Sequence, residues 1–101
     1  MIKVLYDQKD KRYNYLNVKG HSEFEDSGKD LVCAAVSSIV FGFMNALDEL
    51  NEDNYLKETV NEVEIIINND NEKIQDYFEL TMYQLKTIEE SYSQYIKIER
   101  K

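Results

Sequence analysis

The segment from Leu31 to Leu50 constrains the fold most, because its apolar residues cover much of the circumference of a helix. An apolar stripe recurs there at helical spacing, and three valines widen it. The stripe is Leu31, Ala34, Ala35, Ile39, Phe43, Ala46, Leu47 and Leu50, and the widening residues are Val32, Val36 and Val40. A helix with so wide an apolar arc is expected to be buried on most sides, between a sheet and a second helix or subunit.

Period-two alternation predicts strands on both sides of this helix. Residues 2–6 and 12–19 alternate apolar and polar positions, and the polar residues 7–11 between them predict a hairpin turn. Residues 62–68 are dense in β-branched side chains, which favours a central strand. Residues 95–99 alternate again and predict a short edge strand.

A second helix is predicted after the central strand. Asn69, Asp70 and Asn71 supply turn and N-cap chemistry. The apolar stripe that follows is Ile74, Phe78, Thr81, Leu85, Ile88 and Tyr92. The resulting order is strand, strand, helix, strand, helix, short strand. It predicts one α+β domain over residues 1–101, with a small, mainly antiparallel sheet packed against two helices.

Composition narrows the possible partners. The chain has 20 acidic and 12 basic residues, a formal net charge of −8, which counts against direct binding of nucleic acid. An apolar run of membrane-span length is not found, and the first residues lack the apolar core of a signal peptide. A single cysteine suits a reducing compartment. We therefore expect a cytoplasmic protein with no membrane partner.

The only histidine, His21, and the only cysteine, Cys33, flank one short polar loop. Asp30 is a natural N-cap, which would make Cys33 the third residue of the helix. There, unpaired N–H groups and the helix dipole lower the pKa of a thiol and are able to hold an oxyanion. A histidine beside the sulfur would take the thiol proton and return it to the leaving amine.

Other residues of this region are candidates for supporting roles. Ser37 lies one turn after Cys33 and is placed to bond the sulfur or a bound peptide, and a second Asp30 oxygen could orient His21. Gly20 ends the preceding strand, and Gly28 is a flexing point for a loop that could cover a peptide. The loop residues are Ser22, Glu23, Phe24, Glu25, Asp26, Ser27 and Lys29.

Each of these residues also has a purely structural interpretation. Cysteine is often a core residue, so Cys33 could simply be buried, and a lone histidine is usually a surface or capping residue. Asp30 could only cap the helix, Ser37 could allow close packing, and the glycines could serve turn geometry alone. One histidine and one cysteine supply too few ligands for structural zinc, so no metal or cofactor is expected.

The region resembles a known family at many positions. Gly20-His21 is followed by residues 28–37, which match the pattern G-x-D-(I/L)-V-C-A-A-V-S. On this motif, and on the length of the chain and its C-terminal segment, the sequence resembles the ribosomal-processing cysteine proteases, the Prp or YsxB-like family. The resemblance implies a compact, often dimeric fold with a mobile loop over the cleft.

The resemblance also implies a function. Cys33 would be the nucleophile and His21 the general base, with Gly20, Gly28, Asp30 and Ser37 in supporting positions. The substrate would be the short N-terminal extension of a basic large-subunit ribosomal protein, removed during ribosome maturation. The alternative is a non-catalytic, ribosome-associated binding module in which Cys33 is a buried structural residue.

Overall fold

The computed structural model describes residues 1–21, 27–50 and 53–101, of which 27–29 are described by their backbone alone. These ranges contain two helices and five strands. In chain order they are β1 (Ile2–Lys9), β2 (Arg12–Lys19), α1 (Ser27–Glu49), β3 (Tyr55–Glu58), β4 (Glu62–Ile66), α2 (Glu72–Ser91) and β5 (Ile96–Arg100).

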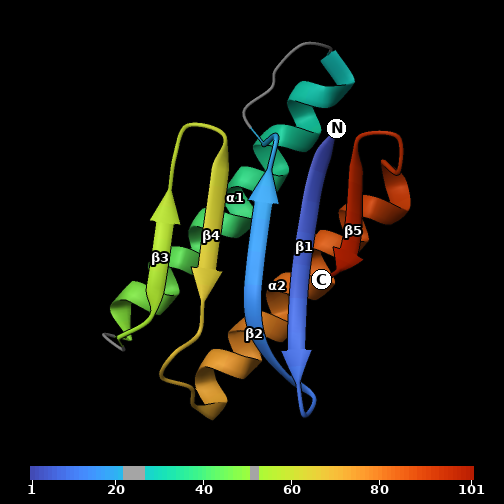
Figure 1. Ribbon diagram of the computed structural model, residues 1–101. Helices are drawn as coiled ribbons and strands as arrows, with labels where there is room; N and C mark the ends of the chain where they lie inside the picture. Colours follow the sequence, from blue (N-terminus) through green and yellow to red (C-terminus); the bar gives the residue numbers. More distant parts are fainter. Residues whose placement is uncertain (22–26, 51–52) are drawn as a thin grey trace.

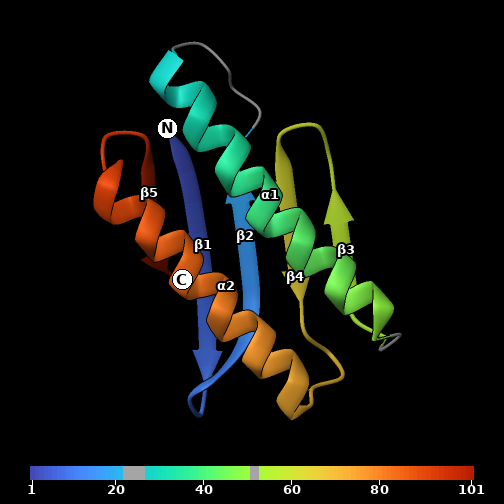
Figure 2. The ribbon, with the colours of Figure 1, turned by 180° about the vertical axis from the view of Figure 1, so that it is seen from behind.

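The five strands form one sheet in the order β3-β4-β2-β1-β5. Every neighbouring pair is antiparallel except β1 and β5, which run parallel. Both helices lie on the same face of this sheet, as opposite views of the ribbon show (Figures 1 and 2). The predicted class, a mainly antiparallel sheet packed against two helices, is confirmed.

The core lies between the sheet and the two helices. Its side chains come from alternate positions of the strands and from the inner faces of the helices. Phe78 of α2 is fully buried in it, with its ring stacked on Tyr13 at 4.8 Å and edge-on to Phe43 at 5.0 Å. The buried apolar residues are Ile2, Val4, Leu16, Val18, Val32, Cys33, Val36, Val40, Phe43, Leu47, Val63, Ile65, Ile74, Phe78, Met82, Leu85 and Ile96.

Helix α1 differs from the sequence prediction in how it is buried. It packs on the sheet and on α2, but its outer side is open, where Leu31 is 59% exposed and Ala34, Ser38 and Gly42 are also exposed. These last three residues are small, so exposing them leaves little apolar surface in water. By length and composition alone, Asp30–Glu49 would suffice to span a membrane, a property that core helices share.

The start of α1 also differs from the prediction. The helix begins at Ser27, so Asp30 lies in its first turn and is not its N-cap. The first turn consists of the polar residues Ser27, Gly28, Lys29 and Asp30, which carry no apolar periodicity. Hydrophobic spacing therefore detects the helix only from Leu31 onward. An acidic residue such as Asp30 still stabilises a first helical turn through the dipole.

The strands show three smaller differences. β3 was not predicted, because Tyr55–Glu58 is a four-residue edge strand with little apolar pattern. The hairpin turn is only Asp10 and Lys11, whose φ values of 53° and 67° fit a two-residue turn that matches strand twist. β4 ends at Ile66, two residues earlier than predicted. The predicted second helix and C-terminal edge strand are confirmed, with Asn71 as the N-cap of α2.

Candidate active site

The candidate site lies where β2 ends beneath α1. Gly20 is buried there and has a φ of 89°, a conformation that L side chains rarely adopt. Its N–H donates to the carbonyl of Asn61 at 3.1 Å, which ties the end of β2 to the β3–β4 turn. The positive φ turns the chain out of the strand, so that the next residue, His21, packs against α1.

Ser37 of α1 holds the His21 ring from one side. The Ser37 hydroxyl lies 3.0 Å from Nδ1 of His21 and donates to the His21 carbonyl oxygen at 3.4 Å. A hydroxyl has one proton to donate, so while Ser37 donates to the carbonyl the hydrogen of its contact with Nδ1 comes from the ring. That arrangement corresponds to the neutral tautomer whose lone pair is on Nε2. Phe41, one turn further along α1, meets the ring edge-on at 5.6 Å.

The other ring nitrogen, Nε2, is buried and has no hydrogen-bond partner among the described residues. His21 as a whole is only 5% exposed. Burial lowers the pKa of His21 below its ordinary value of 6.5, because the imidazolium is poorly solvated there, and the negative charge of Glu58 partly opposes that effect. The ring is therefore held neutral, with a basic lone pair that nothing in the described structure uses.

Cys33 lies on the same side of α1, one turn before Ser37. Its side chain has no exposed surface. Its Sγ donates to the Gly20 carbonyl at 3.8 Å, so the sulfur sits against the backbone of the residue that precedes His21. A bond to a carbonyl oxygen favours the protonated thiol, because a thiolate has no hydrogen to donate.

The helix-terminus role predicted for Cys33 is wrong. Cys33 is the seventh residue of α1, and the unpaired N–H groups of a helix belong to its first turn. The first residue of α1 lies about 9 Å along the axis from Cys33 at 1.5 Å per residue. The helix dipole and free amides at the start of α1 therefore do not act directly on the Cys33 sulfur.

The remaining predicted site residues divide into four groups. Ser37 is brought to the site, but it contacts His21, not the sulfur. Asp30 is exposed, and no bond joins it to His21 within the described ranges. Ser27, Gly28 and Lys29 belong to α1, so the predicted loop does not extend through them. The predicted loop residues Ser22, Glu23, Phe24, Glu25 and Asp26 lie outside the described residues.

Two residues near His21 were missed by sequence reasoning. The apolar stripe predicted for the helix leaves out Phe41, although its spacing of one turn from Ser37 places both on one face. Glu58 belongs to the unpredicted strand β3, and no local pattern connects it to His21. Only the pairing of the strands brings it to this end of the sheet.

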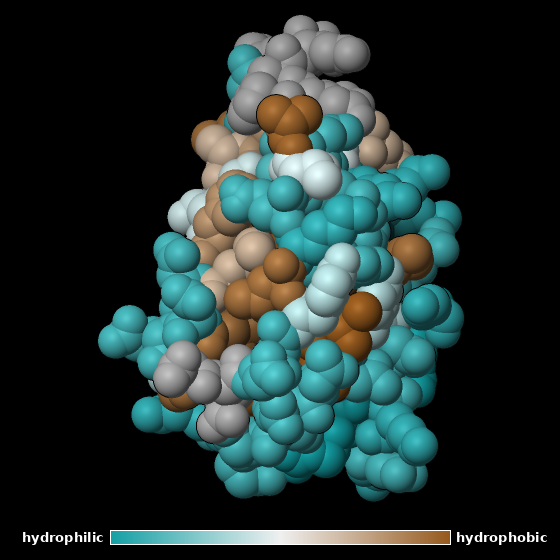
Figure 3. All heavy atoms as spheres, turned by 60° about the vertical axis from the view of Figure 1, so that its left-hand side comes forward, coloured by the Kyte–Doolittle hydropathy of each residue, from teal (hydrophilic) through white to brown (hydrophobic). Residues whose placement is uncertain are grey.

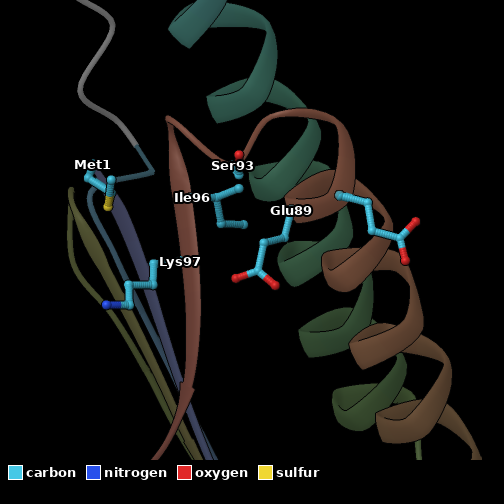
Figure 4. A pocket seen from close by; sticks show the side chains of 6 residues that line it. Met1, Glu89, Ser93, Ile96 and Lys97 are labelled. Atoms are coloured by element: carbon cyan, nitrogen blue, oxygen red, sulfur yellow. The ribbon is translucent and has the colours of Figure 1, made fainter.

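A hollow of about 460 Å³ lies between β5 and the end of α2 (Figure 4). Its lining is Met1, Glu89, Glu90, Ser93, Ile96 and Lys97, so it does not include Cys33 or His21. One carboxylate oxygen of Glu89, Oε2, accepts a hydrogen bond from the Ile98 N–H at 2.7 Å. Within the described part of the chain, no three acidic, histidine or cysteine side chains are grouped to hold a metal ion.

A buried cysteine bonded to the carbonyl of Gly20, and the unpartnered Nε2 of the following His21, are residue types that a thiol-dependent catalytic site needs. The model of the cysteine protease Prp family matches residues 1–97. The chain belongs to this family.

Curated relatives agree with that assignment. The ribosomal processing cysteine protease Prp of Mycoplasma pneumoniae is 31% identical over 87 residues, which cover 86% of this chain and 87% of the relative. The protein of the same name from Mycoplasma genitalium is 50% identical over 42 residues, 42% of this chain and 37% of the relative. The match therefore spans most of the M. pneumoniae protein but little more than a third of the M. genitalium protein.

Solved structures share the whole fold. The ribosomal processing protease Prp of S. aureus in complex with a substrate peptide has a TM-score of 0.90 and 26% identity, with all of both chains covered. The S. aureus protease with a covalently linked product peptide has a TM-score of 0.87 and 27% identity, again over both complete chains.

Proposed function

We propose that this chain is a cysteine endopeptidase that removes the short N-terminal extension of a large-subunit ribosomal protein precursor. Cys33 is the nucleophile and His21 the general base. Membership of the cysteine protease Prp family supports the reaction type. The names of the relatives, and the substrate and product peptides bound to the S. aureus protease, support a peptide from a ribosomal protein as substrate.

The observation that carries the proposal is the unpartnered Nε2 of His21. A buried polar atom without a hydrogen bond costs about 1–3 kcal/mol, so its retention needs a reason. Ser37 fixes the ring with Nδ1 protonated, which leaves Nε2 as the basic nitrogen. An oriented base, in the residue that follows the thiol's acceptor Gly20, provides that reason.

In the proposed reaction, His21 Nε2 accepts the Cys33 thiol proton as the sulfur attacks the scissile carbonyl. The tetrahedral intermediate collapses to a thioester, and the imidazolium gives its proton to the leaving amine. Water, deprotonated by Nε2, then attacks the thioester and restores the thiol. In this mechanism the thiol donates to the Gly20 carbonyl before the reaction, and the thiolate forms as its proton passes to Nε2.

The buried sulfur adds a requirement to this mechanism. Cys33 has no exposed surface, so substrate binding must open the site before the sulfur can reach a peptide bond. Opening also separates Sγ from the Gly20 carbonyl, its acceptor at 3.8 Å. The loss of that bond frees the thiol proton for transfer to Nε2.

The partner and location follow from the same proposal. The net charge of −8 suits a basic ribosomal protein, since opposite charges speed encounter. A cytoplasmic location and a homodimer, both expected from the sequence and its family resemblance, belong to this proposal as well. Sedimentation equilibrium of the purified protein tests the dimer directly.

The proposal is tested by incubating the purified protein with the full-length ribosomal protein precursor of the same organism. Intact-mass spectrometry over time is expected to show one cut near the N-terminus, yielding two fragments whose masses sum to the precursor plus one water. Precursor incubated alone, and mature protein lacking the extension, should stay intact.

A second function, the non-catalytic binding module, is favoured by the complete burial of Cys33 in the core. It predicts that the protein and the precursor co-elute on gel filtration while the precursor mass stays unchanged. That result, with a precursor confirmed to carry its extension, would contradict the protease.

Ser37 provides a prediction about positioning. Ser37→Ala removes the contact at Nδ1, so the ring can rotate and take the other tautomer. We expect kcat to fall about tenfold with KM nearly unchanged. General acid–base catalysis contributes about 10²–10⁴-fold to the rate, and Ser37→Ala removes only part of that contribution because the His21 ring still reaches the correct orientation some of the time. Steady-state kinetics with a peptide spanning the cut measures both parameters.

Ser38→Ala is the matched control for this prediction. Ser38 is the next residue of α1 and is exposed, so its hydroxyl does not hold the ring. An equal loss in both variants, or a Ser37→Ala enzyme with wild-type kcat, would show that Ser37 does not position His21.

A further inference from the structure

We propose that Glu58, at the end of strand β3, stabilises the imidazolium that His21 becomes when it takes the Cys33 proton. Glu58 is not expected to touch substrate. It acts on the reaction only through its charge, which favours the protonated form of His21. The inference rests on the proposed function, because the imidazolium forms only if His21 acts as the base.

The register of the sheet places the Glu58 side chain on the helix-covered face. Glu58 is paired with Val63, Val63 with Val18, and Val18 with Val4. Directly opposed residues of neighbouring strands point to the same face. The three valines are at most 1% exposed and lie in the core, so Glu58 ends a row that is otherwise apolar.

In the ribbon, the end of β3 lies beside α1 and not beneath it (Figure 2). The β3–β4 turn is fixed in this place by two backbone hydrogen bonds. Thr59 N–H donates to the Glu62 carbonyl at 2.8 Å, and Gly20 N–H donates to the Asn61 carbonyl at 3.1 Å. The second bond connects the Glu58 turn directly to the residue before His21.

The other charged groups around His21 are arranged differently. Lys19 pairs in register with Glu62, and both lie on the opposite face of the sheet, where they form an ion pair at 3.7 Å. Lys57 also belongs to that face by strand alternation. On α1, Ser37 and Phe41, which contact the ring, are neutral. Of the charged residues that the structure describes here, Glu58 lies on the helix-covered face with His21, and its negative charge favours the imidazolium.

A charge at this position also has a structural explanation. An inward-pointing charge on an edge strand discourages pairing with another chain. The view onto the β3 side of the molecule shows apolar areas interrupted by hydrophilic surface (Figure 3). This role requires a charge on the edge strand but no effect on His21, so a measurement on the imidazole separates the two roles.

The first experiment follows the pKa of His21 by NMR. His21 is the only histidine, so one imidazole resonance titrates without ambiguity. In the Cys33→Ala background, where no thiol couples to the ring, Glu58→Gln is expected to lower the pKa of His21. Glu58→Asp should retain most of the wild-type pKa. Glu79→Gln, an equal change of charge at an exposed position of α2, should leave it unchanged.

The second experiment measures activity in the presence of Cys33. Glu58→Gln is expected to lower kcat/KM about two- to fivefold, the size typical of an exposed charge acting on another charge. The acid limb of the Glu58→Gln pH–rate profile should move to lower pH. The difference in kcat/KM between wild type and Glu58→Gln should shrink as added salt screens the charge of Glu58. Glu79→Gln should behave as wild type.

The two sets of results separate this inference from the proposed function. Identical His21 titrations in Glu58→Gln and Glu79→Gln overturn the role of Glu58 whether or not the chain is a protease. A Glu58→Gln enzyme as active as Glu79→Gln overturns it as well. Failure of the wild-type protein to cut its precursor overturns the proposed function, while the titration still decides whether Glu58 acts on His21.

Discussion

Cys33→Ala is expected to lower kcat/KM for precursor cleavage by about five orders of magnitude, as removal of the nucleophile does in other hydrolases that form an acyl intermediate. The chain has no second cysteine that could replace the sulfur. Binding should survive, because the methyl group of alanine leaves the backbone of α1 in place. Single-turnover cleavage followed by mass spectrometry measures the loss, and calorimetric titration of Cys33→Ala with the precursor measures binding.

Stability has to be measured alongside activity, because Cys33 is also a core residue. Truncating its side chain should cost about 1 kcal/mol of unfolding free energy, which thermal or denaturant unfolding would detect. The unfolding free energy of Ser37→Ala is a suitable comparison, because this variant truncates a side chain on the same face of α1 and keeps the Cys33 sulfur. If Cys33→Ala still cut the precursor at the wild-type rate, the thiol would be a core group only and the dyad would be wrong.

The fold was predictable where burial imposes a period on the sequence. The strands 2–6 and 12–19 and the stripe from Ile74 to Tyr92 were found because one face of each is buried. β3 was missed because it lies at the edge of the sheet, with Tyr55 exposed and only Leu56 partly buried. The first turn of α1 was missed for the same reason, since its residues are polar. Where no face is buried, hydrophobic spacing carries no signal.

The site was predictable in its members and less so in its geometry. His21, Cys33 and Ser37 were named because they are rare or regularly spaced. The structure joins Ser37 to His21, and Cys33 to the carbonyl of Gly20, the residue before His21. The contact between Ser37 and His21, and the position of Glu58, depend on strand pairing and on where α1 begins. Because the predicted helix begins four residues too late, at Leu31 and not at Ser27, the prediction placed Cys33 at the helix terminus. In the proposed mechanism, an oriented, neutral histidine takes the place of the helix dipole.

His21→Gln is expected to lower kcat/KM by about 10³-fold near neutral pH, within the range that general acid–base catalysis contributes. Glutamine fills much of the same volume and keeps a polar group near Ser37, but it cannot accept a proton. In the wild-type enzyme, activity should rise with pH through a limb below 6.5, because burial lowers the pKa of His21. In His21→Gln this limb should disappear, and the residual activity should rise near the ordinary thiol pKa of about 8.5. Rate profiles of kcat/KM between about pH 5 and 9.5 test this.

Unfolding free energy provides a check that is independent of activity. A histidine with a lowered pKa in the native state takes up its proton more readily when unfolded. Between the native pKa and 6.5 the unfolded chain therefore binds more protons, and wild-type stability should fall as pH decreases through this window. The His21→Gln protein should lack this contribution to the slope. Parallel slopes in urea unfolding of the two proteins would mean that His21 is not held neutral by burial. The acid limb of the enzyme would then have to arise from another group.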